Sequence, residues 1–132
     1  MAIGKYGVKR KRLDYFIKQL NLLDWSNLSN ILEIIIVGSS EKDKNGEYRD
    51  YLHTLIKKFK LINNVKLYSD ISHCEMKNFY INTDIFVLPS IGEPASISIV
   101  EALREGCFCI SSKDNGTSNY INHLENGYLY EE

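Results

Sequence analysis

An aliphatic segment with almost no polar residues limits the possible fold more than any other feature of the chain. Residues 31–37 contain five isoleucine or valine positions, with Glu33 as the only polar residue, and a Gly-Ser-Ser sequence at 38–40 follows them. Such a run predicts a strand that is buried on both faces, as in parallel sheets covered by helices. The segment is far too short to cross a membrane.

Shorter strands and helices are expected to alternate along the rest of the chain. Segment 27–30 is predicted to be a polar break, and 117–122 one helical turn. Apolar spacing predicts helices over about 11–23, 47–60, 75–81 and 98–105, and strands over 2–6, 65–68, 84–88, 107–111 and 128–130. This alternation predicts an α/β class, a Rossmann-like parallel sheet with helices on both faces.

The composition is that of one globular domain. The chain has 132 residues, of which 44% are hydrophobic and 25% charged, and its net charge of −1 gives no general attraction to nucleic acid. Three cysteines and no signal peptide indicate a cytoplasmic protein. Cys107 and Cys109 flank Phe108 on a predicted strand and are expected to be buried, inert thiols. The spacing of cysteines and histidines predicts no metal site.

Ligands of open parallel sheets bind outside the carboxyl ends of the strands, and small and polar residues are concentrated there in this chain. No G-x-G-x-x-G follows a strand, and no phosphate loop ending in Gly-Lys-Ser/Thr is present. The usual dinucleotide and triphosphate sites are therefore not supported.

The most informative of these loops follows the strand at 84–88. Glu93 lies just beyond the strand end, and Glu101 is placed in the first turn of the next helix. Unpaired amides at a helix start favour an anion, and a nearby carboxylate accepts hydrogen bonds from sugar hydroxyls. Two simpler interpretations stay open: Glu93 as a solvated loop carboxylate, and Ser98 with Glu101 as a capping box.

A second charged feature is the basic run Lys9-Arg10-Lys11-Arg12, placed at the start of the helix expected over 11–23. It is either a solvated helix start or part of an anion site. Positive charge at a helix N-terminus opposes the helix dipole. An anionic ligand between these charges and the amide of Ser96 would relieve that conflict.

The stretch from 84 to 102 carries a family resemblance. Glu93 and Glu101 form an E-x7-E pattern after the sequence Asp-Ile-Phe-Val-Leu-Pro-Ser at 84–90, and Gly106, Gly116 and other residues follow in family order. Nearly the whole chain resembles the donor-binding domain of retaining GT-B glycosyltransferases, the glycosyl transferases of group 1. This family includes many bacterial enzymes of polysaccharide and glycolipid biosynthesis.

The resemblance implies roles for the residues of this pattern. Glu93 would be the catalytic residue beside the transferred sugar, and Glu101 would hold the nucleotide ribose. The amides of Ser96, Ile97 and Ser98 would bind the diphosphate. The loop at 69–71 would border the base through its backbone.

The resemblance also implies cations that neutralise the departing diphosphate. Lys5 stands where the family commonly has arginine, and Lys11 corresponds to a family lysine, with Arg10 as a close rival. Fixed cations and oriented amides stabilise charge that develops in a transition state. The substrate would be a nucleoside diphosphate sugar, and no metal or other cofactor is expected.

The chain departs from the family pattern in three places. Ser96 replaces a glycine of the phosphate loop, Asn119 stands where the family often has glutamate, and Ser40 replaces a frequent glycine. These changes concern donor preference more than the fold.

The family also has an acceptor-binding domain, and no part of this sequence resembles it. Residues 1–132 are therefore predicted to be a truncated nucleotide-sugar-binding domain of a hexosyltransferase, inactive in transfer by itself. The absent domain would bind the glycan or lipid-linked acceptor. The full enzyme is expected in the cytoplasm, where it would work in solution or at the inner face of the membrane.

Three other hypotheses remain. A glycoside hydrolase would use two carboxylates at shorter range than the spacing of Glu93 and Glu101 favours. A non-catalytic Rossmann-like nucleotide-binding or interaction module is the second hypothesis, and a binding or signalling module of this kind could have a flavodoxin-like sheet. A degenerate relative would bind partners without transferring sugar.

Overall fold

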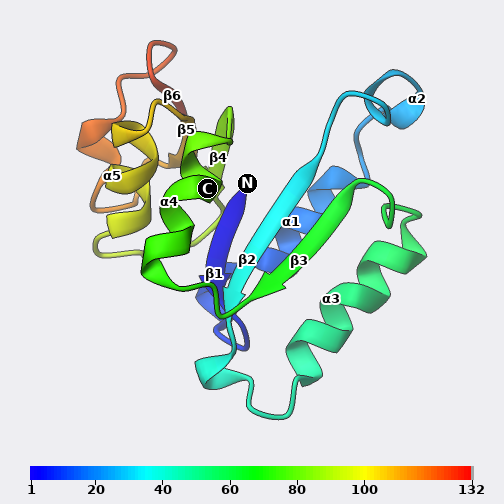
Figure 1. Ribbon diagram of the computed structural model, residues 1–132. Helices are drawn as coiled ribbons and strands as arrows, with labels where there is room; N and C mark the ends of the chain where they lie inside the picture. Colours follow the sequence, from blue (N-terminus) through cyan, green and yellow to red (C-terminus); the bar gives the residue numbers. More distant parts are fainter. Residues whose placement is uncertain (132) are drawn as a thin grey trace.

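The computed structural model of the protein describes residues 1–131, so Glu132, the last residue of the predicted domain, lies outside it. These residues form a six-stranded sheet in which every pair of neighbouring strands is parallel (Figure 1). The strand order is β3-β2-β1-β4-β5-β6. The strands are β1 (Ala2–Lys5), β2 (Ile34–Ser39), β3 (Val65–Ser69), β4 (Ile85–Leu88), β5 (Phe108–Ser112) and β6 (Gly127–Tyr130).

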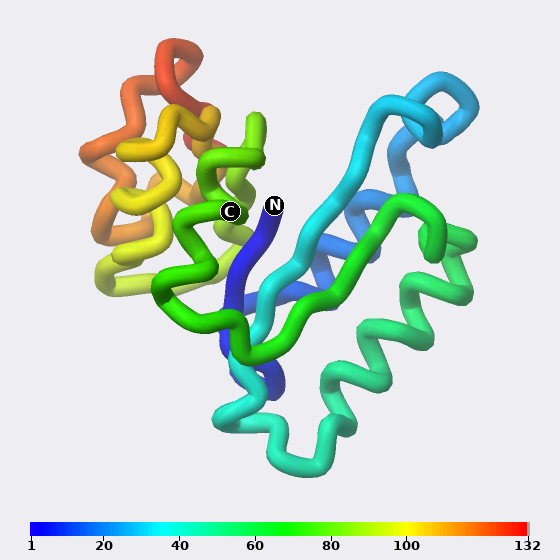
Figure 2. The backbone as a smooth tube through the Cα atoms, in the orientation of Figure 1, coloured from blue at the N-terminus to red at the C-terminus, as the bar shows by residue number. Residues whose placement is uncertain are grey.

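Helices connect consecutive strands, and the chain path is simplest to follow in Figure 2. The α-helices are α1 (Leu13–Leu20), α2 (Trp25–Leu28), α3 (Glu47–Lys58), α4 (His73–Ile81) and α5 (Ile97–Arg104). Three short 3-10 helices are η1 (Lys9–Lys11), η2 (Ser40–Lys42) and η3 (Ser118–Tyr120). The predicted Rossmann-like architecture is confirmed.

Two apolar cores lie on the two faces of the sheet. Helices α1 and α3 pack together over one core, and α4 and α5 pack together over the other (Figure 1). The side chains of successive β1 residues point to opposite cores: Ala2 belongs to the first core, and Ile3 packs against the second. The sheet is therefore covered by helices on both faces, as the aliphatic segment at 31–37 predicts.

The strand order of the sheet tests the hypothesis of a flavodoxin-like module. The chain runs outward from β1 to β3, crosses back, and continues outward from β4 to β6. This is the dinucleotide-fold order, whereas flavodoxin-like sheets have the order 2-1-3-4-5. The flavodoxin-like interpretation is therefore wrong, and the crevice between β1 and β4 is the expected ligand position.

Several predicted boundaries were wrong for local reasons. Helix α1 begins at Leu13 and not at 11, because Arg12 has the left-handed φ of 50°. The predicted polar break at 27–30 overlaps α2, whose N-cap Asp24 accepts a hydrogen bond from the Ser26 amide at 3.0 Å. Strand β2 begins at Ile34, since residues 31–32 continue the turn that leaves α2.

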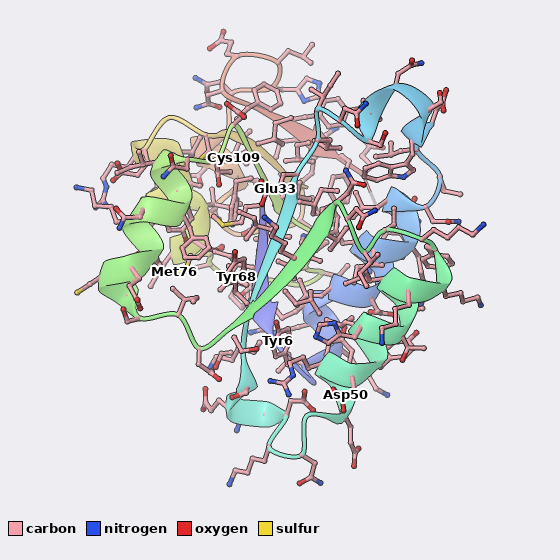
Figure 3. All side chains as sticks on the ribbon, turned by 45° about the vertical axis from the view of Figure 1, so that its right-hand side comes forward. Tyr6, Glu33, Asp50, Tyr68, Met76 and Cys109 are labelled. Carbon is pink, nitrogen blue, oxygen red and sulfur yellow. The ribbon has the colours of Figure 1, made fainter. Side chains whose placement is uncertain are left out.

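A close approach fixes the carboxyl ends of the first three strands. Tyr6 is fully buried, and its hydroxyl donates to the Tyr68 carbonyl oxygen at 2.8 Å. A side chain at Gly38 would lie 2.1 Å from the Tyr6 ring, so only glycine fits between them. Figure 3 shows Tyr6 and Tyr68 near each other at this edge of the sheet.

Cys107 and Cys109 are buried, as predicted, although Cys107 lies just before β5 and only Cys109 is in the strand. Burial raises the pKa of Cys109 to about 12, which keeps its thiol protonated and unreactive. Over residues 1–131, no helix combines the length and the apolar character needed to cross a membrane.

Candidate functional site

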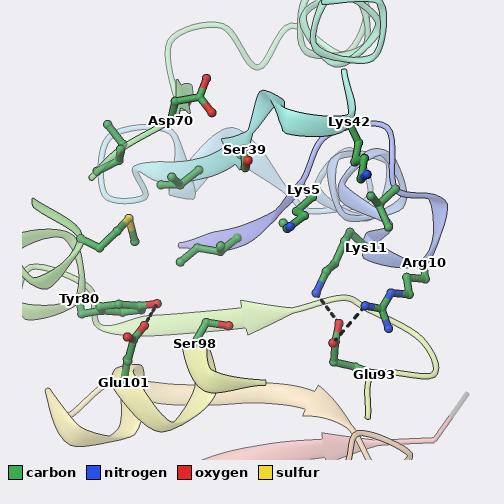
Figure 4. A pocket seen from close by; sticks show the side chains of 17 residues that line it. Lys5, Arg10, Lys11, Ser39, Lys42, Asp70, Tyr80, Glu93, Ser98 and Glu101 are labelled. Atoms are coloured by element: carbon green, nitrogen blue, oxygen red, sulfur yellow. Dashed lines mark hydrogen bonds and ion pairs between the residues drawn. The ribbon is translucent and has the colours of Figure 1, made fainter. Parts of the chain in front are cut away.

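An open cleft of about 870 Å³ lies at the carboxyl edge of the sheet (Figure 4). The ends of β1 and β2, the loop after β3 and the start of α5 contribute to its walls. Of the eight predicted site residues, six line this cleft: Lys5, Arg10, Lys11, Glu93, Ser98 and Glu101. Residues far apart in the sequence thus meet at the position that the sheet topology predicts.

The basic loop after β1 brings its cations to the cleft through a local break in helical geometry. Lys9–Lys11 forms the 3-10 helix η1, and Arg12 takes a left-handed conformation before α1 begins. The basic run is therefore separate from α1 and does not form its solvated first turn. Gly4 allows the loop to fold back closely, since a side chain there would lie 3.0 Å from the Lys11 Cβ.

Glu93 lies against these cations. Glu93 is only 5% exposed. Its Oε2 accepts a hydrogen bond from Lys11 Nζ, and its Oε1 lies 3.6 Å from Arg10 Nη2. The hypothesis of a solvated loop carboxylate is therefore wrong, because a buried carboxylate requires charged or hydrogen-bonding partners. In this structure Glu93 itself pairs with the cations, whereas the sequence predicts an anionic ligand between them and the Ser96 amide.

Backbone contacts hold the Glu93 loop on both sides. The Ile91 amide donates to the Arg10 carbonyl oxygen at 2.9 Å, which ties this loop to the basic loop. The Gly116 amide donates to the Glu93 carbonyl oxygen, also at 2.9 Å. A side chain at Gly116 would lie 1.7 Å from the Pro94 carbonyl oxygen, so the later family glycine is required by this contact.

Glu101 is held differently. Helix α5 begins at Ile97 with Ser96 as its N-cap, which places Glu101 beyond the first turn. The capping box of Ser98 and Glu101 is therefore wrong: Glu101 Oε2 accepts a hydrogen bond from the Tyr80 hydroxyl at 2.9 Å. The capping box of this region lies instead at the start of α4, between Ser72 and Glu75.

The start of α5 meets the cleft through Ser98. Ser96 is buried and Ile97 is 75% exposed, and neither of them lines the cleft. The hydroxyls of Ser96 and Ser98 lie 2.7 Å apart in a hydrogen bond. The first amides of a helix have no partner within the helix, so this end of α5 presents N–H groups to an anion.

Lys5 lies at the edge of the cleft, where its Nζ donates to Glu41 Oε2 at 2.5 Å. Both side chains are about half exposed, so this pair is weaker than the pair between Lys11 and Glu93. Lys5 can exchange Glu41 for an anionic ligand at low cost.

Several further residues of the cleft wall were not among the eight predicted site residues. The loop after β3, which the resemblance places beside the base, contributes Asp70 and Ile71, and η2 contributes Lys42, which sequence reasoning missed. Asp70 accepts hydrogen bonds from the Ser40 hydroxyl at 2.5 Å and amide at 2.9 Å, which lower its pKa below the usual 3.8. The position of Lys42 after a strand end was a usable signal. Tyr80 also lines the cleft, but its place in a short helix gave it no predicted role in the site.

Over the part of the chain that the structure describes, no group of three or more His, Cys, Asp or Glu side chains is arranged to hold a metal ion. The two glutamates are placed at opposite ends of the cleft, each with its own partners (Figure 4). This separation disfavours a glycoside hydrolase, in which both carboxylates face one glycosidic bond.

Comparison with known families adds to this geometry. The sequence model of the family described as "Glycosyl transferases group 1" matches residues 5–132. The chain belongs to this family. An uncharacterized glycosyltransferase of Methanocaldococcus jannaschii is 28% identical over 119 residues, which are 89% of this chain and 28% of that protein.

Solved structures show the same fold. The Anabaena protein HepE, crystallised with UDP-glucose, superposes with a TM-score of 0.79 at 22% identity, over 98% of this chain and 34% of HepE. The C-terminal domain of a group 1 glycosyl transferase from Francisella tularensis has a TM-score of 0.77 at 24% identity, over 98% of this chain and 67% of that one. The chain thus has the fold of this C-terminal domain.

Proposed function

We propose that this chain binds a nucleoside diphosphate sugar and forms the donor-binding part of a retaining glycosyltransferase. The observation that carries the proposal is that one cleft gathers four cationic side chains, a helix start and two separate glutamates. Cations and helix-start amides suit a diphosphate, and carboxylates suit the hydroxyls of ribose and sugar.

The residues would divide the donor between them. Glu101 would accept hydrogen bonds from the ribose, and Glu93 would contact the transferred sugar. Lys5, Arg10, Lys11 and the amides of Ser96, Ile97 and Ser98 would bind the diphosphate in place of a metal ion. Lys11 would then exchange part of its contact with Glu93 for a phosphate oxygen.

In the transfer step the bond between sugar C1 and the β-phosphate oxygen breaks, and its electron pair stays on the diphosphate. The acceptor oxygen forms the new bond to C1 on the same face, and its proton passes to the departing diphosphate. The cations of the cleft would stabilise the charge that grows on this leaving group, because they are already oriented before the reaction.

The acceptor and the site of action belong to the same proposal. This chain spans 28% of the M. jannaschii relative, so transfer is expected to need residues beyond this donor-binding part. The acceptor would be a glycan or a lipid-linked glycan, reached in the cytoplasm or at the inner face of the membrane. Residues 1–132 alone are expected to show no transfer, and turnover by this chain would contradict that expectation.

A titration of the chain with UDP, GDP and ADP, followed by backbone amide shifts, tests donor binding. One nucleotide is expected to shift amides near Ser96 and Ser98. Glu101→Ala and Lys11→Ala are each expected to lower the affinity for this nucleotide about tenfold. Lys113→Ala is the control, because Lys113 pairs with Glu131 away from the cleft. If no nucleotide binds at millimolar concentration while the fold is intact, the proposal fails.

One observation favours a second candidate, a nucleotide-binding or interaction module without transfer. The hydrogen bond between Ser96 and Ser98 lies at the helix start where the family pattern has glycine. UDP-glucose and UDP separate the two candidates. A donor site is expected to bind UDP-glucose more tightly than UDP and to lose that preference in Glu93→Ala, whereas a module that ignores the sugar would show no such preference.

A further inference from the structure

Tyr80 is a residue of the cleft whose chemistry the proposed function leaves unused. It lies in the last turn of α4, is 3% exposed, and packs on Phe86 with ring centroids 5.8 Å apart. The capping box of Ser72 and Glu75 fixes the start of the same helix. Packing and capping therefore hold the Tyr80 ring in one position.

The backbone of Tyr80 is also anchored. Its carbonyl oxygen accepts hydrogen bonds from the Thr83 amide at 3.0 Å and from Cys107 Sγ at 3.3 Å. These contacts tie the end of α4 to the turn before β4 and to the residue that precedes β5. The hydroxyl of Tyr80 is therefore a donor on a rigid support.

That hydroxyl donates to Glu101 Oε2 at 2.9 Å, and both residues line the cleft (Figure 4). The other oxygen, Oε1, lies 3.7 Å from Nδ1 of His73, whose side chain is 86% exposed. Burial and the bond to Glu101 raise the pKa of Tyr80, so the hydroxyl keeps its proton and remains a donor. Tyr80 thus engages Oε2, which leaves Oε1 to accept a hydrogen bond from a ligand.

The contrast with Glu93 matters here. A neutral donor orients a carboxylate and leaves its negative charge in place, whereas Lys11 neutralises Glu93. A fixed, charged carboxylate makes strong hydrogen bonds to hydroxyls. A site built to bond a hydroxyl rejects the analogue that lacks it, because its buried polar group then stays unpaired.

We propose that Tyr80 is a positioning residue that aims Glu101 at the ribose and so gives the site a preference for ribonucleoside over deoxyribonucleoside diphosphates. This inference rests on the proposed donor function. Tyr80 acts through Glu101 and makes no contact with the reacting atoms.

The experiment compares UDP, GDP and ADP with their 2′-deoxy counterparts by amide-shift titration. For the nucleotide that binds, the unmodified chain is expected to prefer the ribo form about tenfold, and Tyr80→Phe is expected to reduce that preference to about threefold. Tyr80→Phe keeps the ring and its packing on Phe86. Tyr120→Phe, a change on the exposed η3, is the matched control and is expected to keep the full preference.

A double variant shows whether Tyr80 acts through Glu101. Glu101→Gln is expected to lose the preference, and adding Tyr80→Phe to it is expected to change the ratio no further. A purely packing role for Tyr80 predicts lower stability in both backgrounds with an unchanged ratio.

Three results overturn the inference and are distinguishable. If Tyr80→Phe keeps the full ribo preference, Tyr80 does not position Glu101, and the donor proposal stands. If the unmodified chain binds both forms equally, the ribose role of Glu101 fails as well. If no nucleotide binds to the folded chain, the donor proposal itself fails.

Discussion

The two ends of the cleft hold a glutamate each, in opposite ways. Glu93 lies in a loop and meets Lys11 and Arg10, which are more than eighty positions away in the sequence. Glu101 lies on a helix and meets the neutral hydroxyl of Tyr80. The Glu93 side chain is 6% exposed and paired with cations, whereas the Glu101 side chain is 19% exposed, bonded to a neutral hydroxyl, and 3.7 Å from His73 Nδ1.

This difference predicts different responses to ligands and substitutions. At the Glu93 end, an anionic ligand must share or displace an ion pair that already exists. At the Glu101 end, a ligand hydroxyl adds to a carboxylate that is oriented and available. Stability is therefore expected to depend mostly on the first end, and selectivity for the nucleoside on the second.

The largest expected effect comes from Gly116→Ala, which disturbs the Glu93 end alone. The new Cβ would lie 1.7 Å from the Pro94 carbonyl oxygen, so the loop must move, and we expect the free energy of unfolding to fall by about 3 kcal/mol. Urea denaturation measures this loss. The amide shifts of Glu93 should change, and those near Glu101 should not.

Gly106→Ala is the control for this substitution. Gly106 has a φ of 87°, and a Cβ there would meet no atom within 4 Å, so only backbone strain of about 1 kcal/mol is expected. Equal losses in the two variants would show that the contact between Gly116 and Pro94 has no special importance.

Next in size is Lys11→Ala. Glu93 would remain buried with the Arg10 guanidinium 3.6 Å away as a weaker partner, and we expect a loss of about 2 kcal/mol in the free energy of unfolding. Lys5→Ala is the control, because the pair of Lys5 with Glu41 is exposed and is expected to contribute less than about 1 kcal/mol. A larger loss in Lys5→Ala would reverse the proposed ranking.

Opposite changes in affinity are expected from the two glutamine substitutions. Glu93→Gln removes the carboxylate that competes for Lys11, so UDP, which has no sugar to contact Glu93, is expected to bind about fivefold more tightly. Glu101→Gln is expected to lower the affinity for UDP by about the same factor. Isothermal titration calorimetry measures both, and weakening in both variants would remove the distinction between the two ends.

The smallest effect concerns Asp70, a carboxylate of the same cleft that neutral donors also hold. Its pKa is lowered by the hydroxyl and the amide of Ser40, so the folded state binds this proton less readily than the unfolded chain does. This contribution to stability is present above pH 3.8, the ordinary pKa, and is lost as the pH falls through the lower folded value.

Ser40→Ala tests that assignment. It removes the hydroxyl and keeps the amide, so the pKa of Asp70 is expected to rise part of the way toward 3.8. A carboxyl-carbon NMR titration measures the change, with Ser72→Ala and its partner Glu75 as a second pair of the same kind. An unchanged pKa of Asp70 in Ser40→Ala would show that the amide alone determines it.

Much of the fold followed from the sequence because strand and helix patterns are local. The aliphatic run at 31–37 predicted the buried strand, although turn hydrogen bonds after α2 moved its start to Ile34. The pattern missed α2 because a four-residue helix between polar positions depends on the Asp24 cap and has too few turns for periodicity.

The residues of the site were also named from sequence, through the resemblance and the strand-end rule. Six of the eight predicted residues line one cleft. Their roles in binding and transfer remain predictions.

The sequence by itself determined which residues are buried in strands, which loops end at the carboxyl edge, and which charges are available there. Only the tertiary structure decided how those charges pair. The pairing of Lys11 with Glu93, the bond from Tyr80 to Glu101, and the fit of Gly116 against Pro94 join segments that are 21 or more positions apart. Local propensity carries no information about such contacts, because they depend on how the strands are ordered in the sheet.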